Sequence, residues 1–378
     1  MDIRSKCIHC SSGLKDAYGA VSFPIYQSAT FSHPGVGEST GYDYSRMQNP
    51  TREQLEKTVA ALEGGIDALA FSSGMAAIDA VMELFAPGSR IIVSDDIYGG
   101  THRLFEHIGK KNGLQFDYVN TSDLSRIKNA ILPSTRALFI ETPTNPMMQV
   151  SDIAAVSALG RENGLLTIVD NTFLTPYFQR PLALGADIAL HSGTKFLGGH
   201  NDTIAGFLVV KGRELSEKLR FIFKTTGACL SSMDSWLILR GIKTLAVRLE
   251  KQQENAFAVA NWLLEHPKVA KVHYIGLPAH PSYSLSKKQA TGFGSMISFE
   301  TDSEETAVQI LKRVRLIQYA ESLGGVESLI TYPMLQTHAD IPEEIREEKG
   351  ITKKLLRLSV GLEYAGDLTN DLRQALKD

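Results

Sequence analysis

The sequence is poor in cysteine and contains no long apolar run. Only 3 of its 378 residues are cysteine, an odd number that argues against a disulfide framework and suits a reducing compartment. No run approaches 18 apolar residues, so we expect no membrane-spanning helix. The first residues, Met-Asp-Ile-Arg-Ser-Lys, lack the apolar core of a signal peptide. We therefore expect a cytoplasmic protein.

Net charge is small as well. The chain carries 39 Lys+Arg and 42 Asp+Glu, a formal net charge of −3. Broad nucleic-acid binding requires a basic surface that displaces counterions, so we expect no nucleic-acid partner. With 43% apolar and 21% charged residues the composition is that of an ordinary globular protein. Its length allows roughly two to three domains.

Two of the cysteines, Cys7 and Cys10, form a C-x-x-C pattern that encloses His9 and is typical of zinc or redox sites. A closed zinc site needs about four ligands, yet the remaining cysteine is Cys229 and no H-x-x-x-H follows. We therefore expect two free thiols near a mobile terminus, and no metal site.

Three regions differ in hydrophobic pattern. Residues 1–50 are rich in Ser, Gly and Tyr and show no sustained period, which indicates an arm that lies on another surface. Residues 51–240 alternate apolar runs with helical patterns, which predicts βαβ units and an α/β fold with a mostly parallel central sheet. Residues 241–378 begin with a long helical stretch around Ile242–Glu265 and predict a smaller C-terminal α+β domain. Strands are predicted at Ala68–Phe71, Arg90–Ser94, Ala137–Glu141, Leu166–Asp170, Ile188–His191 and Gly206–Val210, with helices at Met75–Phe85, His102–Lys111 and Asp152–Asn163.

In α/β sheets, ligands bind at the carboxyl ends of the strands, and the end of the first predicted strand is a turn of small residues. Ser72-Ser73-Gly74-Met75 leads directly into a helix. Free backbone N–H groups and the helix dipole make such a turn a phosphate site. An ordinary serine-capped helix has the same pattern.

Two further strand ends carry charged residues. Asp170 ends one apolar run, and a carboxylate there needs a cationic or hydrogen-bonding partner, which a structural salt bridge also provides. Lys195 follows the next run, after Ser192 and Thr194. A desolvated lysine has a lowered pKa and forms a Schiff base with a carbonyl, although a lysine that reaches solvent also fits the pattern. Together, the phosphate turn, the acid and the lysine match the requirements of pyridoxal phosphate.

The chain resembles the Cys/Met-metabolism family of pyridoxal-phosphate enzymes, first in its lysine signature His191-Ser-Gly-Thr-Lys-Phe-Leu-Gly-Gly-His200. This family comprises cystathionine γ-synthases, cystathionine β- and γ-lyases, homoserine-ester sulfhydrylases and methionine γ-lyases. The resemblance implies a fold-type I, aminotransferase-like subunit in a homotetramer built from two dimers. Its other motifs, which cover nearly the whole chain, are Tyr44-Ser-Arg46, Asn49-Pro-Thr51, Ser73-Gly-Met75, Tyr98-Gly-Gly-Thr101, Glu141-Thr-Pro-Thr-Asn-Pro146, Asp170-Asn-Thr-Phe173, Ser322-Leu-Gly-Gly-Val-Glu-Ser328 and Arg357-Leu-Ser-Val-Gly361.

The resemblance also implies roles for individual residues. Lys195 is expected to form the Schiff base and shuttle protons, and Asp170 to hold the proton of the pyridinium nitrogen. Tyr98 is expected to stack on the ring and to act as an acid or base. The phosphate is expected to bind Ser73, Gly74, Met75, Ser192 and Thr194, with Tyr44 and Arg46 reaching the phosphate of the neighbouring subunit. Asn145, Ser322 and Arg357 are expected to position the amino-acid substrate, with Arg357 on its α-carboxylate.

The motifs do not decide the reaction, because γ-replacement and β-elimination use the same residues. Methionine γ-lyases carry a cysteine where this chain has Gly100, and many γ-lyases carry a glutamate where it has Thr331. Bacterial cystathionine γ-synthase/O-acetylhomoserine thiol-lyases are most similar in the segments Gly35-Val-Gly-Glu-Ser-Thr-Gly41, His200-Asn-Asp202 and Tyr332-Pro-Met-Leu-Gln-Thr-His338. We therefore expect γ-replacement that joins an O-acylhomoserine and cysteine, or sulfide, to give cystathionine, or homocysteine. Cystathionine β-lyase or γ-lyase is the alternative.

Two other classes of function fit the sequence less well. Gly37-Glu-Ser39-Thr-Gly41 matches the G-x-S-x-G pattern of serine hydrolases, which requires a strand before it and a helix after it. Here it lies in a polar segment, so a hydrolase is a remote alternative. A non-catalytic protein of this fold is expected to have lost Lys195 or Asp170, and both are present.

Overall fold

The computed structural model describes residues 1–9, 16, 18–337 and 343–377, so Cys10 and His338 lie outside the described residues. Its larger sheet has seven strands in the order β1-β7-β6-β5-β4-β2-β3. All neighbouring strands are parallel except for β7, which is antiparallel to β1 and β6. The strands are β1 (Asp67–Phe71), β2 (Arg90–Ser94), β3 (Gln115–Val119), β4 (Thr135–Glu141), β5 (Leu166–Asp170), β6 (Ile188–Ser192) and β7 (Gly206–Val210). The predicted α/β class is confirmed.

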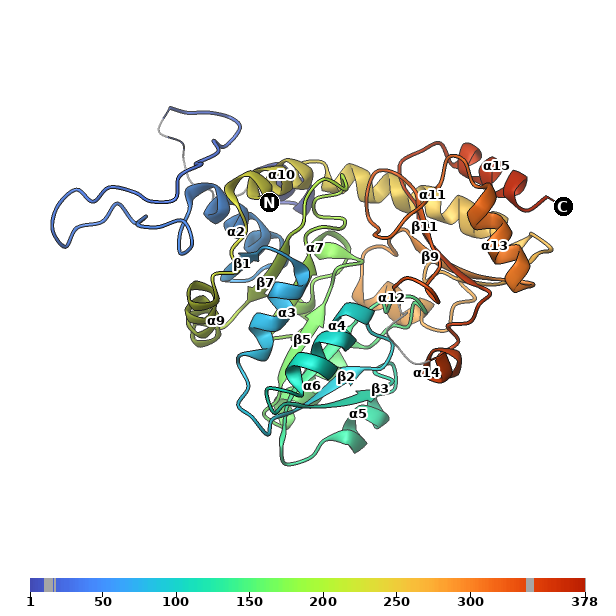
Figure 1. Cartoon of the computed structure of the whole chain (residues 1–378), viewed down its shortest axis with the longest axis horizontal. Helices are drawn as coiled ribbons and strands as arrows, with labels where there is room; N and C mark the ends of the chain where they lie inside the picture. Colours follow the sequence, from blue (N-terminus) through green and yellow to red (C-terminus); the bar gives the residue numbers. More distant parts are fainter. Residues whose placement is uncertain (10–15, 17, 338–342, 378) are drawn as a thin grey trace.

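Helices cover both faces of this sheet (Figure 1). Because side chains alternate along a strand, β1 contributes Ala68 and Ala70 to one core and Leu69 and Phe71 to another. The first core lies against α2 and α10, and the second against α3 and α9. The helices up to this point are α2 (Pro50–Glu63), α3 (Gly74–Met82), α4 (Gly99–Leu104), α5 (Leu124–Ala130), α6 (Ile153–Glu162), α7 (Thr175–Phe178), α8 (Pro181–Leu184), α9 (Arg213–Thr226) and α10 (Ser232–Ile242).

One helix of the structure differs from the prediction in its bounds and in its type. The helix expected at His102–Lys111 begins instead at Gly99, and its second half is a π-helix, η1 (Phe105–Gly109). Phe105 stacks on Phe116 of β3 with ring centroids 4.5 Å apart. Strand β3 itself was not predicted: within it Phe116 is buried, whereas Gln115 is exposed and Tyr118 is half-buried, so it lacks the continuous apolar run of the central strands.

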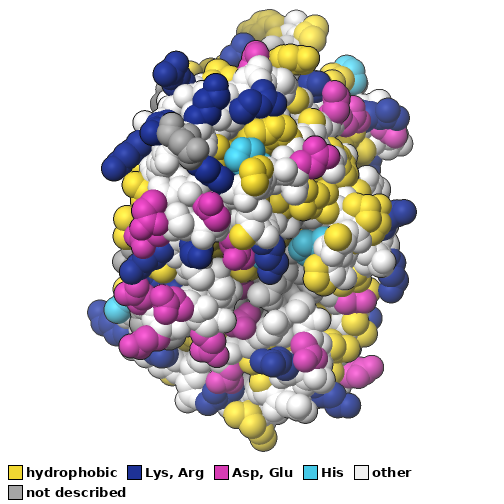
Figure 2. All heavy atoms as spheres, turned by 90° about the vertical axis from the view of Figure 1, so that its right-hand side faces the viewer, with side chains coloured by type: hydrophobic (Ala, Val, Ile, Leu, Met, Phe, Trp, Pro, Cys, Tyr) yellow, Lys and Arg dark blue, Asp and Glu magenta, His cyan; other side chains and the backbone are white. Residues whose placement is uncertain are grey.

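A second, five-stranded sheet follows the long helix α11 (Leu245–Leu264), in the order β10-β11-β12-β9-β8. Its own core joins β9 and β12 to α11, α13 and α15. The face of the molecule on this side shows basic and acidic side chains interspersed (Figure 2). The remaining elements are β8 (Val269–His273), β9 (Met296–Thr301), β10 (Gln318–Tyr319), β11 (Leu329–Thr331), β12 (Leu355–Ser359), α12 (Tyr283–Gln289), α13 (Glu304–Arg313), α14 (Glu343–Glu348) and α15 (Ala365–Ala375).

The N-terminal segment projects from the body (Figure 1). Residues 18–48 contain no helix or strand apart from one isolated bridge between Thr30 and Tyr44. The G-x-S-x-G pattern lies in this segment, so it lacks the flanking strand and helix that a serine hydrolase requires. No described helix is long and apolar enough to cross a membrane.

The chain before this segment is more ordered than the sequence predicts, because α1 (Ile3–Ile8) packs on the body. Cys7 is a free thiol, but α1 buries it, and burial raises its pKa to about 11. The expectation of a thiol at a mobile terminus is therefore wrong for Cys7. Cys10 lies outside the described residues.

Candidate active site

The carboxyl ends of three parallel strands meet at one edge of the larger sheet. Glu141, the last residue of β4, is the register partner of Asp170, the last residue of β5, and Asp170 is in turn paired with Leu190 of β6. Strand alternation then turns Glu141, Asp170 and Ser192 toward the α3 side of the sheet. There they line a cavity of about 310 Å³.

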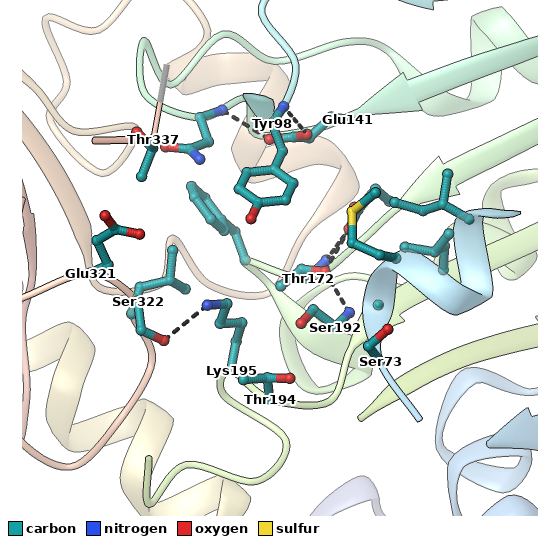
Figure 3. A pocket seen from close by; sticks show the side chains of 18 of the residues that line it. Ser73, Tyr98, Glu141, Thr172, Ser192, Thr194, Lys195, Glu321, Ser322 and Thr337 are labelled. Atoms are coloured by element: carbon teal, nitrogen blue, oxygen red, sulfur yellow. Dashed lines mark hydrogen bonds between the residues drawn. The ribbon is translucent and has the colours of Figure 1, made fainter. Parts of the chain in front are cut away.

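One end of this cavity is built from hydroxyl groups and a helix N-terminus. Ser73 caps α3, its Oγ accepting the N–H of Ala76 at 3.0 Å. Ser192 and Thr194 lie on the same side of the cavity (Figure 3). A Cβ on Gly206 of β7 would lie 2.1 Å from the carbonyl oxygen of Ser73, so only glycine lets this strand approach the turn. The turn therefore offers donors suited to a phosphate.

Asp170 faces the cavity without a cationic partner. Its Oδ1 accepts hydrogen bonds from the backbone N–H and the hydroxyl of Thr172, at 3.0 and 2.6 Å. Among the described residues, no lysine or arginine forms an ion pair with it. Burial raises the pKa of Asp170, while the Thr172 bonds and nearby His191 oppose that rise. A protonated ring nitrogen of a ligand would satisfy this carboxylate.

Lys195 reaches the middle of the cavity, where its Nζ donates to Ser322 Oγ at 2.9 Å (Figure 3). Burial, and then the nearby Arg357 guanidinium, lower the pKa of Lys195 to about 8. Ser322 has a φ of 103°, a conformation that costs free energy for a residue other than glycine. The bonds of Ser322 to Lys195 and Arg357 stabilise this conformation.

Arg357 comes from β12 of the smaller sheet and is 1% exposed. Its Nη1 donates to Asn145 Oδ1 at 2.8 Å, and its Nη2 to the Ser322 carbonyl and the Thr331 hydroxyl, both at 3.0 Å. Burial lowers the pKa of Arg357 to about 10. Its Nε has no hydrogen-bond partner among the described residues, which leaves a buried donor beside the cavity.

Tyr98 and Glu141 form the opposite wall. The Tyr98 side chain points its hydroxyl into the cavity (Figure 3), and the residue is 40% exposed. Its backbone N–H donates to Glu141 Oε2 at 3.0 Å. Burial, and then Asp170, raise the pKa of Glu141 well above its ordinary value.

The structure brings most of the predicted site residues into this one cavity. They are Ser73, Gly74, Met75, Tyr98, Asn145, Asp170, Ser192, Thr194, Lys195, Ser322 and Arg357. Tyr44 and Arg46 lie elsewhere, in a separate hollow that Gln27 and Cys229 also line. Arg46 donates there to the Lys224 carbonyl at 2.5 Å.

Sequence reasoning gave no role to several side chains that also line the cavity. They are Glu141, Pro143, Thr172, Phe173, Glu321 and Thr337, among others. Glu141 carried a usable signal, because it is an acid at the end of a predicted buried strand, as Asp170 is. Glu321 and Thr337 lie outside helices and strands, and no local pattern distinguishes them.

Comparison with known proteins agrees with this geometry. The family of Cys/Met metabolism PLP-dependent enzymes matches residues 4–377. The chain belongs to this family. Its members depend on pyridoxal phosphate, as the sequence predicted, and the cavity has the donors for that cofactor. The α3 turn suits its phosphate, Asp170 its ring nitrogen and Lys195 its aldehyde.

Similar members of the family differ in the reaction that their names give. A cystathionine β-lyase of Lactococcus lactis is 48% identical over 375 residues, covering 99% of both chains. A cystathionine γ-lyase of Bacillus subtilis is 50% identical over 360 residues, covering 95% of both. The structure of a cystathionine γ-synthase from Xanthomonas oryzae, in complex with aminoacrylate and cysteine, superposes with a TM-score of 0.97 at 40% identity, covering 100% of this chain and 98% of that one.

Proposed function

We propose that this protein joins an O-acylhomoserine to cysteine by γ-replacement, giving cystathionine. The ester oxygen leaves the γ-carbon as a carboxylate, and the cysteine sulfur forms the new bond to that carbon. The order of groups along one cavity supports chemistry of pyridoxal phosphate on an amino acid, and the segments similar to γ-synthase/O-acetylhomoserine thiol-lyases support γ-replacement. Lys195 lines the same cavity as the α3 turn, which is proposed to hold the phosphate, and as Asn145, Ser322 and Arg357, which are proposed to hold the amino acid.

Bound pyridoxal phosphate supplies an aldehyde for the amino group and a ring that accepts electrons from the α-carbon. The protein supplies the proton transfers. Lys195 Nζ, with a pKa of about 8, removes and returns protons at the substrate carbons near neutral pH. Asp170 would hold the proton on the ring nitrogen. Tyr98 would hold the ring, and its hydroxyl points into the cavity.

The amino-acid end of the cavity fits a substrate with two ionic ends. Arg357 binds the α-carboxylate, helped by its unpartnered Nε. Glu321, beside Ser322 (Figure 3), offers a carboxylate for a second ammonium group. Cysteine as nucleophile and cystathionine as product both carry such a group.

Cystathionine cleavage is the second candidate, and the identities of 48% and 50% to a β-lyase and a γ-lyase favour it. Thr331 does not argue against a γ-lyase as the sequence suggested, because it does not line the cavity and instead holds Arg357. Gly100 remains informative: a Cβ there would lie 2.4 Å from the Tyr98 ring. A cysteine at this position, as in methionine γ-lyases, would displace the ring.

The projecting arm is consistent with an oligomer. Tyr18, Val21 and Val36 are almost fully exposed in the single chain, and a second copy that covers the arm would bury them. We propose that the arm lies on a second copy and brings Tyr44 and Arg46 to that copy's phosphate site, within a tetramer of two dimers.

Two assays decide the reaction. The protein with pyridoxal phosphate is given O-acetylhomoserine plus cysteine, and separately cystathionine alone. Formation of cystathionine in the first assay supports the proposal. Pyruvate and homocysteine from the second, without cystathionine from the first, would replace it with β-lyase, and 2-oxobutyrate and cysteine with γ-lyase.

A further inference from the structure

Glu141 is a buried carboxylate in the cavity wall whose two oxygens are both engaged by backbone. Oε2 accepts the N–H of Tyr98 and Oε1 the N–H of Asn145, each at 3.0 Å. The residue is 6% exposed. Tyr98 follows β2 and Asn145 follows β4, so one side chain connects two loops that the strands themselves leave separate.

Both loops carry side chains that the proposed function needs. The Tyr98 ring enters the cavity, and Asn145 Oδ1 accepts from Arg357 Nη1 at 2.8 Å (Figure 3 shows the Tyr98 contact). Arg357 Nη2 in turn donates to the carbonyl oxygen of Ser322. The hydroxyl of Ser322 accepts a hydrogen bond from Lys195 Nζ. A continuous series of hydrogen bonds therefore runs from the ring-stacking residue to the proton-transferring lysine.

We propose that Glu141 is a positioning residue that sets the distance between the Tyr98 ring and the Asn145–Arg357 pair, and so aligns cofactor and substrate. This inference rests on the proposed function. The side chain suits the task because its two oxygens lie in one rigid plane and accept both backbone N–H groups, and these two bonds oppose the rise in the pKa of Glu141. A glutamine has only one acceptor oxygen. Its NH₂ group would face one of the two backbone N–H groups, so that two donors would oppose each other.

The matched control is Glu63 of α2. It is as buried as Glu141, and its Oε1 accepts from Asn171 Nδ2 at 3.1 Å and lies 2.7 Å from His191 Nε2. It does not line the cavity. Glu63→Gln therefore makes the same chemical change in the same domain without releasing either loop.

The first measurement is steady-state kinetics of the holoenzyme, in whichever reaction the unchanged protein catalyses. Glu141→Gln is expected to keep the visible cofactor band but to raise KM for the amino-acid substrate and lower kcat/KM by about 10²-fold, because small misplacements of reacting groups have effects of that size. Glu63→Gln is expected to change kcat/KM by less than about threefold, since it moves neither loop. Equal losses in the two variants would overturn the proposal.

The second measurement needs no activity. Amide hydrogen exchange of the cofactor-free protein is followed by mass spectrometry in peptides that contain Tyr98 and Asn145. Both peptides are expected to exchange faster in Glu141→Gln and at the unchanged rate in Glu63→Gln. Unchanged exchange in Glu141→Gln would overturn the proposal. If the unchanged protein catalyses neither reaction, the proposed function fails, while this comparison still tests Glu141.

Discussion

The two faces of the larger sheet use polar residues differently at the same three strand ends. Toward α3 lie Glu141, Asp170 and Ser192, around the cavity. On the other face lie their neighbours Thr142, Asn171 and His191, each 0% exposed. Adjacent positions along three strands therefore belong to two different environments.

On the back face, other protein groups bind these polar side chains. Glu63 binds His191 and Asn171, and Gln179 connects Asn171 Oδ1 to the Thr142 carbonyl at 3.0 and 3.1 Å. On the cavity face, the Asp170 carboxylate has only the nearby Thr172 as a hydrogen-bond partner among the described residues. The comparison shows how to separate the two uses. Protein groups bind Glu141 on the cavity face and Asn171 and His191 on the back face, whereas the Asp170 carboxylate has no cationic partner among the described residues and is left for a ligand.

The largest expected effect is on the cavity face. Lys195→Ala is expected to abolish the visible cofactor band and lower kcat by at least about 10⁴-fold, as loss of a central catalytic group does. Its stability without cofactor is expected to stay close to that of the unchanged protein, because the Lys195 side chain makes a hydrogen bond only to Ser322 among the described residues. Absorbance and thermal melts check both statements. A variant that keeps the band would contradict the assignment.

A substitution on the back face is expected to lower stability while the cofactor band is kept. His191→Leu leaves buried Glu63 with a single hydrogen-bond donor, Asn171, and is expected to lower the free energy of unfolding by about 3–5 kcal/mol. Urea unfolding of the cofactor-free protein measures this. The fraction that remains folded should keep the cofactor band. A loss below about 1 kcal/mol would mean that the pair of His191 and Glu63 contributes little to stability.

A smaller effect, on KM, is expected for Arg357, which β12 of the second sheet brings to the cavity. Arg357→Lys keeps the positive charge but loses the paired geometry toward a carboxylate. KM for the amino-acid substrate is expected to rise about 10- to 100-fold with a smaller change in kcat. The same variant should leave the cofactor band intact. Unchanged KM would remove Arg357 from the substrate site.

The smallest expected effect is a pH dependence. Lys195 attacks the cofactor aldehyde only as the neutral amine, and its pKa is lowered from 10.5 to about 8. The rate at which cofactor-free protein acquires the visible band should therefore rise about tenfold from pH 7 to pH 9 and then level off. Stopped-flow absorbance tests this. A rise that continues toward pH 10.5 would show that burial does not lower this pKa.

The central strands were predictable because they are buried on both faces and read as continuous apolar runs. Strands β2, β5 and β7 have the predicted bounds, and β1, β4 and β6 differ by one or two residues. Strand β3 and the π-helix were missed, since β3 has a single buried residue, Phe116, and η1 has no separate sequence pattern. Asp170 and Lys195 were found because charge at the end of a buried strand is unusual locally.

The residues alone were enough to indicate the cofactor. Its phosphate, ring nitrogen and aldehyde each need a different protein group, and each of these groups lies at or just after the end of a different predicted strand. Tertiary structure decided the rest. It placed Arg357 and Glu321 over the cavity, and it paired Glu63 with His191, 128 residues apart in the chain. Local periodicity records which residues are buried, but contacts between distant segments arise only when the two sheets and their helices pack.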